Sequence, residues 1–179
     1  VTFLPVKRGL KTVTGLFGGT PVTVAAFGMG APIATIVLHE LADLGVKRFL
    51  RIGTAMYFPP MEGGQLLISA AAISFEGTSA SYAPGGGPFQ ADRTLIAACR
   101  SAAEAMGETV TAGLFATYDA FYRDMFGIDE EGTQRAAANR LALGKAGVIA
   151  TDMETSALIA AGGALKVAVA SLCLGTVNA

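Results

Sequence analysis

Residues 22–54, VTVAAFGMGAPIATIVLHELADLGVKRFLRIGT, decide how the rest of the chain is organised. An apolar start, glycines at Gly28 and Gly30, an amphipathic middle and an apolar end predict strand, turn, helix and strand. Pro32 suits the first helical turn, where its missing N–H has no partner to lose, and Gly45 suits the left-handed residue that ends a helix. Such a unit is typical of two parallel strands joined by a right-handed crossover. The apolar residues at helical spacing predict its buried face: Ile33, Ile36, Val37, Leu41 and Leu44.

The end of this stretch indicates an anion site. In parallel sheets ligands bind beyond the carboxyl ends of the strands, where Arg51 and Thr54 are expected. A guanidinium can hold a pair of oxygens and the hydroxyl can donate a further hydrogen bond, which suits a compact oxyanion such as phosphate. The alternative is that Arg51 caps the sheet edge in a salt bridge, and taken alone that is the commoner role. A dinucleotide site is disfavoured, because Ile33 stands where a third glycine is needed and Arg51 has the wrong sign for the ribose.

Composition bounds the class of protein. The 179 residues suffice for one domain, and 52% of them are apolar against 15% charged. This apolar surplus predicts a sheet covered on both faces, or surface buried against another subunit. The formal net charge of -1 gives no field that would attract nucleic acid or an anionic membrane. Cys99 and Cys173 lack metal-like spacing and indicate buried thiols in a reducing cytosol, so we expect a cytoplasmic protein with no metal site.

The rest of the chain predicts strands and helices around one sheet. Residues 1–14 predict a strand pair that turns at Gly18 and Gly19, and 77–88 predict a surface loop. The other predicted strands are 66–75, 109–117, 148–151 and 166–174, and the helices are 92–106, 133–145 and one that Asp152 opens.

Chemistry is carried by short segments after the predicted strands. Asp152 and Glu154 open a helix, where acidic residues commonly just complement the helix dipole. The functional alternative is that one carboxylate accepts hydrogen bonds from a vicinal diol such as that of ribose, with Met153 packed under the sugar. Phe121 and Tyr122, expected at a strand end, could form a flat wall for a base, although aromatic residues there are more often plain core.

These segments together resemble one known family. The motifs, in order, are Gly28-Met29-Gly30-Ala31-Pro32 with Glu40-Leu41, then 49–54, Ser81-Tyr82-Ala83-Pro84, Asp119-Ala120-Phe121-Tyr122 and Asp152-Met153-Glu154. Each motif is weak alone, but in this order and spacing they resemble the nucleoside phosphorylase superfamily, in its hexameric purine and uridine phosphorylase branch.

The resemblance implies an α/β fold, a three-layer α/β/α sandwich with a mixed, partly closed central sheet. It also implies reversible phosphorolysis of a nucleoside to free base and ribose 1-phosphate, with inorganic phosphate as co-substrate and no cofactor. The partners would be the nucleoside, phosphate and further copies of the chain, as dimers and commonly trimers of dimers. Residues 1–179 would be a single domain, and relative to the family we expect its first strand and final helix to be absent.

The resemblance also assigns site residues. Arg51 and Glu154 would be the catalytic residues, with phosphate held by Arg51, Thr54 and Arg8 from the neighbouring subunit. Ribose would be bound by Met153, Glu154 and Thr54. The base-binding positions would be Phe121, Ala55, Met56, Met125 and Asn178.

Departures from the family leave the base open. Uridine phosphorylases read uracil with a glutamine and an arginine, where this chain has Met125 and Gly127. Ala55 and Met56 narrow the base pocket, while Asn178 looks more like the uridine branch, so uridine is slightly favoured over purine. A nucleosidase of the same fold and a nucleoside-binding protein without turnover remain the alternatives.

Overall fold

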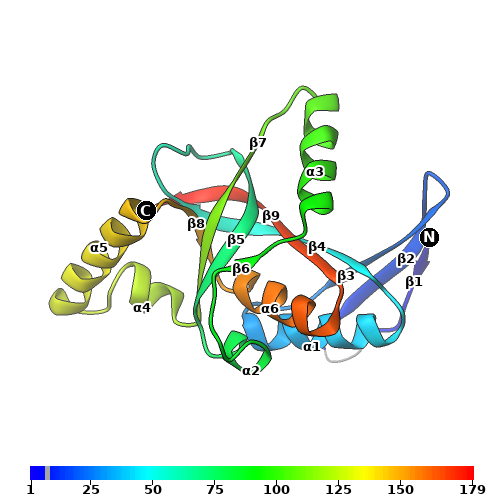
Figure 1. Cartoon of the computed structure of the whole chain (residues 1–179), viewed down its shortest axis with the longest axis horizontal. Coiled ribbons are helices and arrows are strands. Elements are labelled where there is room, and N and C mark those ends of the chain that lie inside the picture. Colours follow the sequence, from blue (N-terminus) through cyan, green and yellow to red (C-terminus); the bar gives the residue numbers. More distant parts are fainter. Residues whose placement is uncertain (7–8) are drawn as a thin grey trace.

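The computed structural model describes residues 1–6 and 9–179, in which strands and helices alternate (Figure 1). The strands are β1 (Thr2–Phe3), β2 (Lys11–Phe17), β3 (Thr20–Ala26), β4 (Arg48–Tyr57), β5 (Leu66–Phe75), β6 (Phe89–Gln90), β7 (Val110–Tyr118), β8 (Val148–Asp152) and β9 (Ala168–Asn178). The helices are α1 (Ala31–Asp43), α2 (Ser79–Tyr82), α3 (Arg93–Ala105), α4 (Phe121–Met125), α5 (Glu130–Lys145) and α6 (Thr155–Leu165).

The larger sheet is mixed and closes on itself. Its strand order is β6-β5-β7-β8-β4-β9, and β5 pairs in addition with β9, so that β5, β7, β8, β4 and β9 form a ring. The pairs β5–β7, β7–β8 and β4–β9 are parallel, whereas β4–β8, β5–β6 and β5–β9 are antiparallel. Helices α1, α2 and α6 lie on one side of the ring and α3 on another (Figure 1). The predicted mixed, partly closed sheet is therefore confirmed.

The first three strands form a separate antiparallel sheet, which corrects one prediction. β3 pairs along its length with β2, through a turn in which Gly18 and Gly19 have positive φ. The predicted parallel pairing of this strand with the next is wrong, because β4 takes β9 as its parallel partner from Arg48 to Tyr57. The short glycine turn brings β2 beside β3 first, and α1 then carries the chain to the other sheet.

Helix α1 begins and ends as predicted, and its predicted buried face is confirmed in part: Val37 is buried and Ile33 and Leu41 are half-buried. Pro32 lies in its first turn, and Gly45 has a φ of 95° just after its end. Ile36 and Leu44, expected in the core, are 54% and 81% exposed. The helix instead packs on α6. Because α6 is built largely of small residues, close approach favours small residues on α1 as well. The buried residues of α1 are Ala31, Ala34, Thr35, Val37 and Leu38.

Two apolar clusters fill the interior. The larger one includes Leu67, Phe115 and Val169 and lies between the ring and its helices. The second joins Met56 to Met125 and their neighbours near α4 and α5. Among the described helices, none is both long enough and apolar enough to cross a bilayer.

Candidate active site

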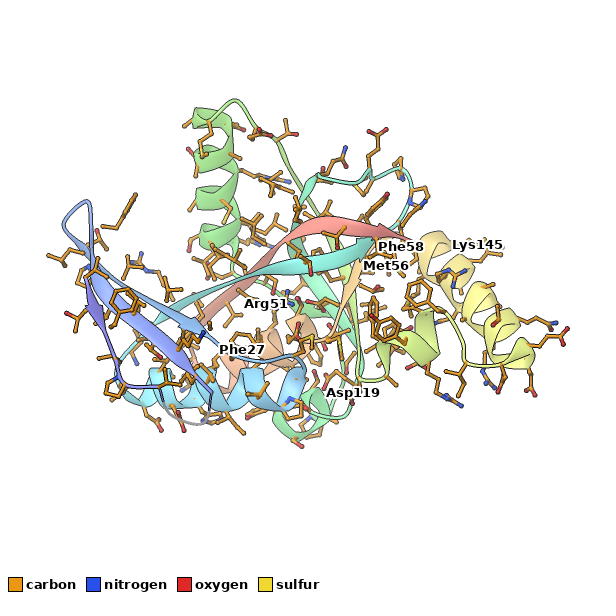
Figure 2. All side chains as sticks on the ribbon, turned by 180° about the vertical axis from the view of Figure 1, so that it is seen from behind. Phe27, Arg51, Met56, Phe58, Asp119 and Lys145 are labelled. Carbon is orange, nitrogen blue, oxygen red and sulfur yellow. The ribbon has the colours of Figure 1, made fainter. Side chains whose placement is uncertain are left out.

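Arg51, near the middle of the molecule in Figure 2, is the centre of a buried polar cluster. It comes from β4, and its side chain is only 11% exposed. Nη1 lies 3.0 Å from Oδ2 of Asp152 and donates a hydrogen bond to Sγ of Cys173, also at 3.0 Å. Nη2 forms an ion pair with Oε2 of Glu154. The cluster thus joins β4, the end of β8, the start of α6 and β9.

Asp152 is fixed by hydroxyl and amide donors. Its Oδ1 accepts hydrogen bonds from Oγ1 of Thr117 at 2.9 Å and from the amide of Thr155 at 3.2 Å. Its Oδ2 accepts the hydroxyl of Thr155. Thr117 is held in turn, because its Oγ1 accepts the amide N–H of Ser156 at 2.9 Å. Donors on both oxygens fix the orientation of the carboxylate.

Glu154 is held by the glycine turn before α1. The amide of Gly30 donates to Oε1 of Glu154 at 2.7 Å, while Oε2 faces Arg51. Gly30 has a φ of 106°, a conformation that residues with a Cβ adopt only under strain. Glu154 itself is 3% exposed and is the residue immediately before α6. The turn predicted from sequence therefore holds a carboxylate of the site.

The two carboxylates change the acid-base properties of their neighbours. Burial acts to lower the pKa of Arg51, but the charges of Asp152 and Glu154 and the hydrogen bond to Cys173 outweigh it, so the pKa is raised above its ordinary value. Burial raises the pKa of Cys173 to about 12, although Arg51 opposes this. Arg51 is therefore permanently charged, and Cys173 is a neutral thiol at physiological pH.

The net charge of the cluster limits what it can bind. Two carboxylates surround one guanidinium, so the described residues carry one net negative charge here. A phosphate dianion needs a further cation, or needs Glu154 to move from Arg51 to another partner. Arg8, which the family resemblance assigns to the phosphate of a neighbouring subunit, lies outside the described residues.

Met153 and Thr54, the other predicted ribose-binding residues, are close in sequence to members of this cluster but differ in burial and orientation. Met153 is half-buried between Asp152 and Glu154. Thr54 is exposed, and it stands three residues after Arg51 in a regular part of β4. Because successive strand residues point to opposite faces, the structure places the Thr54 side chain on the face opposite to Arg51.

The predicted base-binding residues fall into separate groups. Met56 and Met125 are 1% and 0% exposed and belong to the second apolar cluster, against which Phe121 packs. Phe121 opens the short helix α4 rather than ending a strand, which corrects the expectation for it. Ala55 is buried in the larger cluster, and Asn178 is exposed at the end of β9. The structure packs Phe121 against Met56 and Met125, while Ala55 precedes Met56 in the chain and Asn178 is opposite Tyr57 in the pairing of β4 with β9.

The turn after α4 explains one departure from the uridine pattern. Gly127 has a φ of 81°, and a Cβ placed there would lie 2.3 Å from the amide nitrogen of Thr133. Met125 accepts a hydrogen bond from Nη1 of Arg140 through its carbonyl. This close approach to the start of α5 leaves no room for the family's arginine at residue 127.

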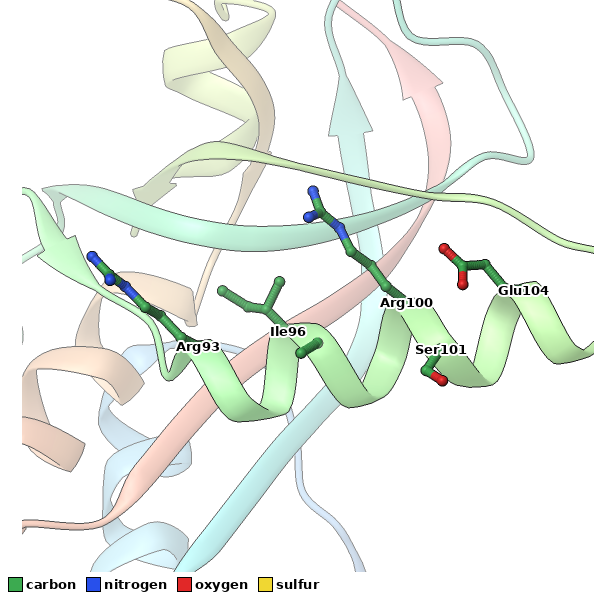
Figure 3. Close-up of a pocket in the computed structure, with 6 residues that line it drawn as sticks. Arg93, Ile96, Arg100, Ser101 and Glu104 are labelled. Atoms are coloured by element: carbon green, nitrogen blue, oxygen red, sulfur yellow. The ribbon is translucent and has the colours of Figure 1, made fainter.

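An open surface hollow lies elsewhere, along a single helix. It has a volume of about 420 Å³ and runs along one face of α3, where Arg93, Ile96 and Arg100 extend to the same side (Figure 3). Its lining comes from α3 and includes no member of the Arg51 cluster. Among the described residues, no group of three or more His, Cys, Asp or Glu side chains could hold a metal ion.

Sequence reasoning missed part of the cluster. Thr117, Thr155 and Cys173 were not predicted as site residues, and Cys173 was interpreted simply as a buried thiol. Its burial is confirmed at 0% exposure. The contact with Arg51 follows from the pairing of β4 with β9, in which Arg51 faces Ser171 and Gly53 faces Cys173. Only that pairing, which the sequence did not reveal, would have identified it.

Comparison with known proteins gives consistent matches. Residues 1–177 match the family described as the phosphorylase superfamily. The chain is 33% identical to a uridine phosphorylase of Treponema pallidum over 177 residues, covering 94% of this chain and 66% of the relative. It is 38% identical over 123 residues to the Escherichia coli uridine phosphorylase, covering 66% of this chain and 49% of the relative. A guanosine phosphorylase of Halorubrum lacusprofundi is 34% identical over 119 residues, or 66% of this chain and 49% of the relative. The chain spans about half the length of most of these relatives.

Proposed function

Because the chain belongs to the phosphorylase superfamily, we propose that it catalyses reversible phosphorolysis of a nucleoside to free base and ribose 1-phosphate. An oxygen of inorganic phosphate forms a bond to the anomeric carbon as the bond from that carbon to the base nitrogen breaks. The electron pair of the broken bond leaves with the base. Phosphate is the co-substrate, and the reaction needs no cofactor.

The observation that carries this proposal is the contact between Arg51 and Glu154. A phosphorolytic site must bind a phosphate dianion and a sugar diol close together. Arg51 is the side chain proposed to bind phosphate and Glu154 the one proposed to bind the diol, and the two are in contact. Arg51 has N–H donors beyond those used by Asp152, Glu154 and Cys173, and these are available to phosphate oxygens. Glu154 would exchange Arg51 for the ribose hydroxyls, and Met153 would pack against the sugar.

Catalysis would come from placement and charge. The transition state resembles an oxocarbenium ion, and a dianion held beside it both attacks and offsets its positive charge. The negative charge of the cluster is why a second cation is needed, and Arg8 of a neighbouring subunit is proposed to supply it. Thr54 would contribute to phosphate and ribose from the opposite face only after a local change in β4.

Assembly and location follow from the same proposal. A site completed by a neighbour's Arg8 requires at least a dimer, and a trimer of dimers is proposed from the family resemblance. Exposed apolar side chains on both faces of the first sheet, including Phe3, Leu16 and Phe17 at 79%, 70% and 81% exposure, are consistent with burial against another subunit. The protein is proposed to act in the cytoplasm on small molecules, without nucleic acid or membrane.

Uridine is the proposed nucleoside. The similar proteins include enzymes named uridine phosphorylase and one named guanosine phosphorylase. Phe121, Met56 and Met125 supply an apolar wall for a base, with Ala55 and Asn178 as further proposed contacts. Since Gly127 leaves no place for an arginine, uracil would be read with fewer charged contacts than in the family pattern.

The test is product formation from uridine and from inosine, with and without phosphate. Release of base that depends on phosphate and yields an equimolar sugar phosphate supports the proposal. Equal release without phosphate would make the protein a nucleosidase. Calorimetric binding of nucleoside with no product in either condition would make it a binding protein.

A further inference from the structure

We propose that Asp152 is the positioning residue of this site, which holds the guanidinium of Arg51 so that its free N–H donors face phosphate. The inference rests on the proposed function and assigns a role to a side chain for which the family resemblance provided none. Asp152 does not itself touch substrate in this proposal. It acts through Arg51.

Asp152 has more fixed partners than any other member of the cluster. Both of its oxygens accept hydrogen bonds, from Thr117 on β7 and from the amide and hydroxyl of Thr155 on α6. It is 3% exposed, and its Oδ2 lies 3.0 Å from Nη1 of Arg51. A carboxylate fixed from two elements can fix a guanidinium in turn, because the ion pair is directional and shielded from water.

The two carboxylates have different roles: Asp152 keeps its contact with Arg51, and Glu154 exchanges Arg51 for the sugar. Glu154 must leave Arg51 when it binds a sugar diol, so it cannot also keep the arginine in place during the reaction. Asp152 has no such duty and contacts Nη1, whereas Glu154 contacts Nη2. Cys173 supports the same nitrogen as Asp152, at 3.0 Å from Nη1. One edge of the guanidinium is thus permanently anchored while the other can exchange partners.

A purely structural role for Asp152 makes a different prediction. The Asp152 carboxylate accepts the amide N–H of Thr155 at the start of α6, as a helix-capping residue would. If capping were its only role, its loss would lower thermal stability and leave phosphate affinity unchanged. Asp92 provides the matched control, because its carboxylate caps α3 by accepting the amides of Thr94 and Leu95, far from Arg51 in sequence.

The test compares D152N and D92N with the wild-type protein. Phosphate affinity is measured by calorimetry, and KM and kcat are measured separately for phosphate and nucleoside. Replacing a residue that orients a ligand-binding group commonly lowers affinity by about 10- to 100-fold, and we expect D152N to weaken phosphate binding by that factor. The nucleoside KM should change less, and D92N should bind phosphate like wild type. Equal phosphate affinity in D152N and wild type overturns the inference.

A double-mutant comparison separates positioning from general damage. R51K removes the guanidinium that Asp152 orients. Adding D152N to R51K should therefore weaken phosphate binding far less than D152N weakens it in the wild-type protein. Additive losses overturn the inference. If D152N does not fold, T155V takes its place, because it removes the hydroxyl that Oδ2 of Asp152 accepts while conserving shape. Failure of wild type to bind phosphate, in contrast, would overturn the proposed function itself.

Discussion

The amide of Gly30 and the carboxylate of Glu154 are joined by a 2.7 Å hydrogen bond across 124 residues of sequence. The glycine turn and the acidic segment are weak motifs separately, and the fold makes them one unit. The turn delivers its N–H to the carboxylate that is proposed to hold ribose, while Arg51 takes the other oxygen. Substitutions of Gly30 and of Glu154 should therefore both affect ribose binding.

G30A should weaken nucleoside binding. Gly30 has a φ of 106°, so an alanine costs on the order of 1–3 kcal/mol of backbone strain and moves the N–H away from Glu154. We expect a higher KM for nucleoside together with a lower melting temperature. G45A is the control, because Gly45 has a φ of 95° and open space around it. An equal rise in KM in both variants would contradict this assignment.

R51K should slow the reaction while keeping the charge. A lysine ammonium is a single point charge and cannot serve Asp152, Glu154 and phosphate at once. We expect kcat/KM to fall by about 30- to 1000-fold, equivalent to about 2–4 kcal/mol of transition-state stabilisation. The control is R135K on the exposed face of α5, where Arg135 pairs with Glu131 at 3.7 Å. Activity of R51K close to wild type would remove Arg51 from the mechanism.

Glu76 should make stability depend on pH in the acid range. Burial acts to raise the pKa of Glu76, but hydrogen bonds from Ser79, Ser74 and Thr78 outweigh it and lower the pKa below the ordinary 4.5. The folded protein therefore holds the proton less tightly than the unfolded chain. The stabilisation is complete above the unfolded pKa and is lost as pH falls through the folded one.

The measurement is the free energy of unfolding of wild type and E76Q from neutral to acid pH. Wild type should be more stable than E76Q near pH 7, and the difference between their free energies of unfolding should shrink as the pH falls below about 4.5. A difference that stays constant over this range would show that the ionised carboxylate contributes nothing.

G127A should destabilise the turn between α4 and α5 more than a positive φ alone explains. Gly127 and Gly107 have φ values of 81° and 75°, but only the Cβ at residue 127 would collide with neighbouring backbone. We expect G107A to cost about 1 kcal/mol and G127A clearly more. Denaturant unfolding of both variants gives the comparison, and equal losses would contradict the steric argument.

The sequence predicted local structure well where the signals were local. Pro32, Gly45 and the Gly18-Gly19 turn bounded their elements as expected, and β5 was predicted at its observed bounds. The buried face of α1 was predicted only in part: Val37 is buried, but Ile36 and Leu44 are exposed, because the helix packs on the small residues of α6. The pairing of β4 with β9 was also missed, since the partner strand lies more than a hundred residues away.

The candidate site shows the same division. Arg51 and Glu154 were singled out before their contact was known, and the structure places them together. The expected position of Arg51 beyond the carboxyl end of its strand is wrong, because β4 continues from Arg48 to Tyr57. Thr117, Thr155 and Cys173 were not predicted, because the sequence does not indicate which group a threonine or cysteine in a strand or helix will hydrogen-bond. The side of β4 on which Thr54 lies follows from strand alternation, which the family resemblance alone did not take into account.

The closed ring of strands has a consequence for how the protein fails. Arg51, Thr117, Asp152 and Cys173 come from β4, β7, β8 and β9, so none of these four strands can detach without dismantling the buried polar cluster. Heating should then abolish turnover and melt the barrel in one sharp event, with no inactive yet folded form in between.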